Sequence, residues 1–66
     1  GRMAEVFEWF RRHAGDRGAS VNECAAGLGR HPQGLRGVIE RLEGAHRLEL
    51  IPSRPYRYRL PQGSPK

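Results

Sequence analysis

The chain has 66 residues, a net charge of +5 and one cysteine, which limits it to a single small domain without an internal disulfide. No apolar run approaches the roughly 20 residues that cross a membrane, and the N-terminus lacks the pattern of a signal peptide. Cys24 lies in the apolar run Cys-Ala-Ala, so we expect a buried thiol in a reducing, intracellular environment, cytoplasmic or nuclear.

The positive charge is concentrated in the second half of the chain. Up to Gly29 four arginines face four acidic residues, whereas the rest of the chain has eight basic residues and only three acidic ones. This asymmetry is typical of a surface that meets a polyanion. Solubility and a codon bias toward arginine are the alternative explanations.

Two helices are expected in the first half of the chain. Apolar residues repeat at helical spacing over residues 3–14, and the glycine-containing segment 15–18 ends that helix. The inward face is expected to comprise Met3, Val6, Phe7, Phe10 and Ala14. A capping box from Ser20 to Glu23 then starts a second, short helix, because each of these two side chains can bond the backbone amide of the other.

A third helix is expected from Pro32, since a missing N–H needs no partner at the first helical position. Its inward face is expected to comprise Leu35, Val38, Ile39 and Leu42. The helix is expected to end within residues 43–46, with Gly44 or His46 in the left-handed conformation.

Beyond residue 46 the apolar period changes to two, which predicts a β-hairpin. Leu48 and Leu50 alternate with their neighbours, and the aromatic and aliphatic side chains of residues 56–60 alternate with two arginines. The proline-containing segment 52–55 forms the turn. We place one domain at residues 3–60, and interpret residues 61–66 as a linker and residues 1–2 as a cloning remnant.

The order of helix, short helix, tight turn, helix and hairpin resembles the winged helix-turn-helix family over almost the whole chain. The matching segments are residues 20–29, 32–42 and 55–60. The resemblance implies an α+β fold in which three helices pack on a two- or three-stranded antiparallel sheet. In that family a short additional strand, here around Ala19, pairs with the hairpin.

No recognisable active site is present in the sequence. His13, His31 and His46 are far apart and lack cysteine or carboxylate neighbours at metal-ligand spacing. The glycines between residues 27 and 37 match neither a dinucleotide-binding nor a Walker motif, and we interpret them as turn formers. We therefore expect a binding module that is not an enzyme, without cofactor, metal or small-molecule substrate.

The third helix is the expected reader of nucleic acid, because the family places this helix in the major groove. With its apolar residues turned inward, Gln33, Gly37 and Glu40 lie on the outward face, and Arg36 and Arg41 flank them. Arginine bonds guanine bidentately and glutamine bonds adenine, whereas a glutamate must accept from a cytosine amine or point away. An ordinary solvated face is the alternative.

Phosphate contacts are expected at the start of the third helix. Arg30 and His31 lie where free amides and the helix dipole attract an anion. His31 can equally serve as the cap of that helix.

The hairpin is the stronger signal for a polyanion partner. Its basic edge is expected to comprise Arg54, Arg57 and Arg59. Such an edge can follow a phosphate backbone or enter a minor groove, and Tyr56 near the tip can stack on a base. An ordinary basic strand is the alternative.

Two narrower resemblances concern the hairpin and the general outline. Pro52, Pro55 and Tyr56 are similar to the prolines and the aromatic residue in the hairpin of the Z-DNA-binding subgroup. That subgroup carries an asparagine and a tyrosine on the third helix where this chain has Arg36 and Glu40. The outline also resembles the winged-helix repeats of the selenocysteine-specific elongation factor, which bind an RNA hairpin.

The sequence therefore predicts a nucleic-acid-binding module, with duplex DNA favoured over structured RNA. The main alternative is a protein-interaction module that forms a homodimer or docks on a neighbouring domain through Trp9 and the first helix. Trp9 lies at the border of the apolar face, where it either covers the rim of the core or anchors a partner. A third alternative is a structural domain that positions its neighbours.

Overall fold

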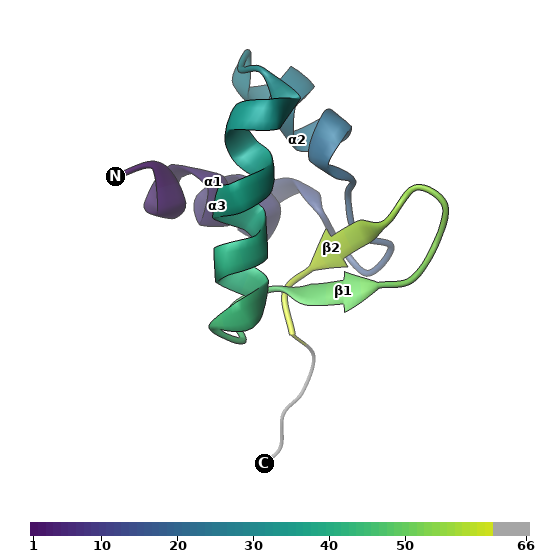
Figure 1. Cartoon of the computed structure of the whole chain (residues 1–66). Coiled ribbons are helices and arrows are strands. Elements are labelled where there is room, and N and C mark those ends of the chain that lie inside the picture. Colours follow the sequence, from purple (N-terminus) through teal and green to yellow (C-terminus); the bar gives the residue numbers. More distant parts are fainter. Residues whose placement is uncertain (62–66) are drawn as a thin grey trace.

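The helices and strands follow the predicted order. The computed structural model describes residues 1–61 and contains α1 (Arg2–His13), α2 (Val21–Leu28), α3 (Pro32–Gly44), β1 (Glu49–Ile51) and β2 (Arg57–Arg59) (Figure 1). The α+β class is confirmed. The predicted linker lies outside the described residues except for Pro61, and α1 begins one residue before its predicted start.

Local signals in the sequence predict the helix ends correctly. The Glu23 amide donates to Ser20 Oγ at 3.1 Å, and the Ser20 amide donates to Glu23 Oε1 at 2.9 Å, so the capping box is confirmed. His46 follows α3 with a φ of 62°, so of the two residues predicted to be left-handed His46 is the one that is, while Gly44 lies inside α3. In contrast, the glycines at positions 27, 34 and 37 lie inside α2 and α3. Their interpretation as turn formers is wrong.

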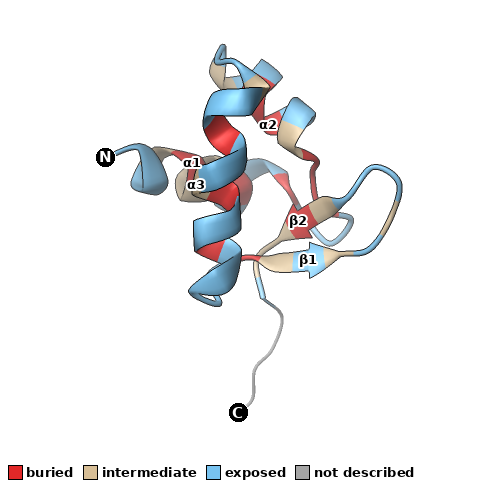
Figure 2. Cartoon of the chain, viewed as in Figure 1, coloured by how far each residue is buried: buried red, intermediate tan, exposed pale blue. Residues whose placement is uncertain are grey.

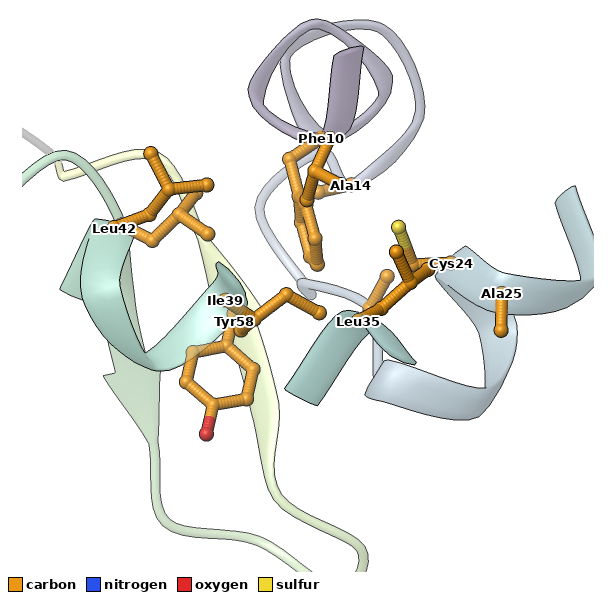
Figure 3. Packing of buried hydrophobic residues seen from close by; sticks show 11 residues of the cluster. Phe10, Ala14, Cys24, Ala25, Leu35, Ile39, Leu42 and Tyr58 are labelled. Carbon is orange, nitrogen blue, oxygen red and sulfur yellow. The ribbon is translucent and has the colours of Figure 1, made fainter. Parts of the chain in front are cut away.

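The core lies between the three helices and the sheet. α3 packs on α1 and α2, and β2 packs on α1 (Figure 1). Phe10 and Tyr58 meet edge to face with ring centroids 6.5 Å apart, and Cys24 is fully buried as predicted (Figures 2 and 3). The largest fully buried side chains are Phe10, Leu35, Ile39, Leu42, Leu48, Val6 and Cys24.

Two apolar residues depart from the predicted pattern. Met3 is 38% exposed, because it lies in the first turn of α1 at the edge of the core, beside Phe7 and Leu42. Leu50 is also 38% exposed, although it shares a face of the sheet with its partner Tyr58. β1 is the outer strand, so the helices cover Tyr58 and leave Leu50 open.

The opposite face of the sheet covers the turn between α1 and α2. Ala19 forms an isolated antiparallel bridge with Tyr58, closed by two backbone hydrogen bonds of 2.8 Å. This bridge is all that the structure shows of the predicted third strand. Gly18 has a φ of +79°, and a Cβ at this position would lie 2.8 Å from both Ile51 Cδ1 and the Tyr58 carbonyl oxygen. Glycine is therefore required where the turn meets the sheet.

Candidate nucleic-acid interface

The outward face of α3 is the one that helical periodicity predicts. Gln33, Arg36, Gly37, Glu40 and Arg41 are all exposed, and much of α3 is coloured as exposed in Figure 2. On the inward side three of the four predicted core residues are buried, and the fourth is half-buried. Polar side chains along α3 are therefore available to a ligand.

A cleft of about 430 Å³ lies between α3 and the hairpin loop, residues 52–56. From α3 it is lined by Arg36 and Glu40, one helical turn apart. Its other lining residues are Ser20, Val21, Asn22, Pro55, Tyr56 and Tyr58. The structure thus brings Arg36 and Tyr56, two of the predicted binding residues, to one site.

The sequence does not directly predict that the start of α2 borders this cleft. The bridge between Ala19 and Tyr58 draws the chain before α2 against β2, and the residues that follow then line the cleft. The expected strand around Ala19 is the signal from which this proximity follows. Asn22 is exposed at this edge of the cleft and belongs to the candidate site.

The hairpin loop presents its own side chains to solvent. Tyr56 is 61% exposed, and Arg54 is also exposed. Ser53 stabilises the loop, because its Oγ donates to the Pro55 carbonyl at 2.8 Å and its amide donates to the Ile51 carbonyl at 2.8 Å. The loop therefore offers one exposed guanidinium and one exposed aromatic ring.

Tyr58 forms a wall of the cleft with its polar end. Figure 3 shows the phenol oxygen directed away from the apolar cluster, and Tyr58 also lines the cleft. Burial raises the pKa of Tyr58, with further contributions from the negative charges of Glu40 and Glu43. The hydroxyl therefore remains protonated at neutral pH and can donate a hydrogen bond.

Arg57 and Arg59 do not form the free basic edge that strand alternation predicts. Arg57 Nη1 donates to the Gly18 carbonyl at 2.9 Å and to Glu23 Oε1 at 3.2 Å. Arg59 Nη1 donates to the Asp16 carbonyl at 2.9 Å, and its Nη2 lies 3.6 Å from Glu49 Oε2. Both arginines extend from the sheet face that covers the turn after α1, where carbonyls and carboxylates hold their guanidinium groups. Arg54 is the exposed arginine of the hairpin.

The start of α3 is also engaged within the domain. Arg30 Nη2 lies 3.0 Å from Glu5 Oε1 on α1. His31 Nδ1 accepts from the Gln33 amide at 3.3 Å, so His31 caps α3. Of the two roles expected for His31, the structure shows capping, and a phosphate at this position would compete with these contacts.

The arginines of residues 1–61 therefore fall into two groups. Those that pair with a carboxylate are Arg11, Arg12, Arg30, Arg57 and Arg59. The arginines that form no ion pair within the described part of the chain are Arg2, Arg17, Arg36, Arg41, Arg47 and Arg54. Among these, Arg47 lies over the ring of Phe7 at 5.6 Å from its centroid. Three of these six arginines, Arg36, Arg41 and Arg54, thus lie on α3 and the hairpin loop.

Trp9 covers the rim of the core. It is half-buried, meets Phe10 edge to face at 5.2 Å and stacks on His13 at 5.0 Å. One side of it borders a second cleft of about 580 Å³, which Arg57 also lines. The structure thus places Trp9 against its own domain while leaving part of the indole accessible.

Residues 1–61 contain no cluster of three or more His, Cys, Asp or Glu side chains able to hold a metal ion. In the same part of the chain, no helix has both the length and the apolar character that a membrane crossing requires.

Comparison with protein families, with curated proteins and with solved structures finds no match to this chain.

Proposed function

We propose that this domain is a winged helix-turn-helix module that binds nucleic acid, with duplex DNA favoured over structured RNA. The order of three helices followed by an antiparallel hairpin is compatible with that fold. The observation that carries the proposal is the position of three of the six arginines that form no ion pair within residues 1–61. Arg36, Arg41 and Arg54 lie on the two elements that border the cleft, together with the exposed Tyr56.

In this proposal α3 enters the major groove. Arg36 and Gln33 contact base edges, because a guanidinium matches the acceptors of guanine and an amide matches the donor and acceptor of adenine. Arg41 contacts a phosphate at the flank of the helix. These contacts require no rearrangement of the core, since all three side chains are already exposed.

The hairpin loop supplies the second contact. Arg54 bonds the phosphate backbone or enters a minor groove, and Tyr56 packs against the sugar or an accessible base. Arg57 and Arg59 act indirectly, because their bonds to the turn after α1 and to nearby carboxylates fix the strand that carries the loop. The proposed interface therefore contains fewer hairpin arginines than the sequence pattern predicts.

The proposal is tested by fluorescence anisotropy with duplex DNA, single-stranded DNA and a hairpin RNA at about 50 mM and about 200 mM salt. Binding is expected to weaken with salt, since each phosphate neutralised releases a counterion. Arg36→Glu and Arg54→Glu should each weaken binding at least tenfold at low salt. Arg17→Glu changes the net charge equally at an exposed position between α1 and α2 and serves as the matched control.

Two outcomes would overturn the proposal. The first is that the unmodified domain binds none of the three nucleic acids at low salt. The second is that Arg17→Glu weakens binding as much as the two interface variants, since binding would then follow total charge and not this surface.

The alternative function is protein interaction through Trp9 and α1. The observation in its favour is that the half-buried indole borders the second cleft, so part of it can contact a partner. Sedimentation velocity of the domain and of Trp9→Ala distinguishes a homodimer from a monomer. Concentration-dependent association that Trp9→Ala abolishes would favour this alternative.

A further inference from the structure

Glu40 is a carboxylate on the outward face of α3, with Arg36 and Arg41 near it in the sequence. It is exposed, lines the cleft together with Arg36 and Tyr56, and forms no ion pair within residues 1–61. This lack of a partner is informative because Arg36 lies one helical turn before it and Arg41 directly follows it. Glu5, Glu8, Glu23 and Glu49, by contrast, all pair with arginines.

A carboxylate in this position opposes the approach of a phosphate backbone. It can favour binding only where the ligand presents a hydrogen-bond donor to it. On the major-groove edges of the bases, donors are limited to the amino groups of cytosine and adenine. The adenine amino group lies beside the N7 acceptor, which repels a carboxylate, whereas the cytosine edge has no such neighbouring acceptor.

We infer that Glu40 is a specificity-determining residue that accepts a hydrogen bond from a cytosine amino group. The inference rests on the proposed function and adds a base preference to it. Arg36, one helical turn away, supplies the complementary donor for guanine O6 and N7. Gly37 lies between them on α3, and apart from its chain neighbours and the helix backbone no atom lies within 4 Å of where its Cβ would be, so the helix backbone can approach the bases closely.

Glu40 and Arg36 together predict a DNA duplex in which a cytosine lies in the same base pair as the guanine contacted by Arg36, or in the adjacent base pair. It also predicts DNA as the ligand, because the major groove of an A-form RNA helix is too narrow for side chains to read. Glu40 thus excludes sequences that place only acceptors or phosphates opposite α3.

The test is selection from a randomised DNA duplex library by the unmodified domain, by Glu40→Ala and by Glu40→Gln. Glu43→Gln is the matched control, because Glu43 is also exposed on α3 and forms no ion pair within residues 1–61. The unmodified domain and the Glu43 variant should enrich cytosine beside guanine. Both Glu40 variants should lose at least about fivefold of the preference at the cytosine position, while their affinity for an unrelated duplex stays equal or rises.

The outcomes separate this inference from the proposed function. Retention of the cytosine preference in Glu40→Ala, or binding without any base preference, would overturn the inference and leave nucleic-acid binding intact. Absence of any binding by the unmodified domain would overturn both. Circular dichroism of the Glu40 variants should match that of the unmodified domain, because the side chain has no ion-pair partner to lose within residues 1–61.

Discussion

The indole of Trp9 on α1 packs directly against Gly27 on α2. A Cβ at position 27 would lie closest to Nε1 of the indole and 2.8 Å from its Cε2, closer than Cβ atoms approach other atoms in proteins. The stacked ring of His13 and the edge contact with Phe10 restrict the indole on its other sides. A glycine inside a helix costs about 1 kcal/mol relative to alanine, and here that cost is offset by the close approach of two helices.

Gly27→Ala is therefore expected to destabilise the domain by about 1–3 kcal/mol, because the added methyl overpacks the contact with Trp9. Gly37→Ala is the matched change on α3, where the methyl would meet no atom within 4 Å. It should stabilise the domain by up to about 1 kcal/mol through helix propensity alone. Urea denaturation measures both values. Equal stabilisation by the two alanines would show that the indole moves aside at no cost.

Arg57 and Arg54 should separate fold stability from nucleic-acid binding. Arg57 shares the Glu23 oxygen that also accepts from the Ser20 amide, so Arg57→Gln is expected to lower the free energy of unfolding by about 1 kcal/mol. Its affinity for DNA should change less than twofold. Arg54→Gln should weaken DNA binding and leave the free energy of unfolding nearly unchanged, since Arg54 is exposed and unpaired within residues 1–61.

Denaturation and anisotropy titrations on the same protein samples measure both quantities. If Arg57→Gln weakened DNA binding as much as Arg54→Gln and left stability unchanged, Arg57 would belong to the DNA-binding surface.

Cys24 is expected to be inert in the folded domain. Burial, and then the negative charge of Glu5, raises the pKa of its thiol to about 11, so almost no reactive thiolate exists at pH 8. A disulfide reagent such as Ellman's reagent should therefore react slowly with the native domain and rapidly in denaturant. Rapid labelling under native conditions would show that the core opens readily around α2.

Features that depend on neighbouring residues were predictable from the sequence. The capping box at Ser20 joins residues three positions apart, and the end of an apolar periodicity narrows the left-handed residue to Gly44 or His46, of which the structure has His46. The outward position of Arg36 and Glu40 follows from the 100° step of a helix whose inward residues are already identified. Such features need no knowledge of what lies across the fold.

Features that depend on distant contacts were not predictable in the same way. Strand alternation correctly separates Arg57 from Tyr58, but it does not show that the turn carrying Gly18 lies beneath the arginine. The exposure of Leu50 similarly depends on how far the helices extend over the sheet. Arg57 and Arg59, half of the hairpin residues expected to bind nucleic acid, therefore lie on a surface that contacts the rest of the domain.

The ion pairs of Glu8 on α1 predict a specific dependence of stability on pH. Hydrogen bonds from Arg11 and then Arg12 lower the pKa of the Glu8 carboxyl from 4.5 to about 2. Because the pKa is lower in the folded state, ionised Glu8 stabilises the domain fully above about pH 4.5. This stabilisation is lost progressively as the pH falls toward 2.

Glu8→Gln should therefore lower the melting temperature at pH 6, and the difference from the unmodified domain should disappear by about pH 2. The difference should also shrink at about 0.5 M salt, because these exposed charges are screened. Glu43→Gln is the control, since Glu43 forms no ion pair within residues 1–61. Thermal melts followed by circular dichroism at pH 2–6 measure the effect. A difference that stays constant over this range would mean that Glu8 acts through helix propensity or packing and not through its charge.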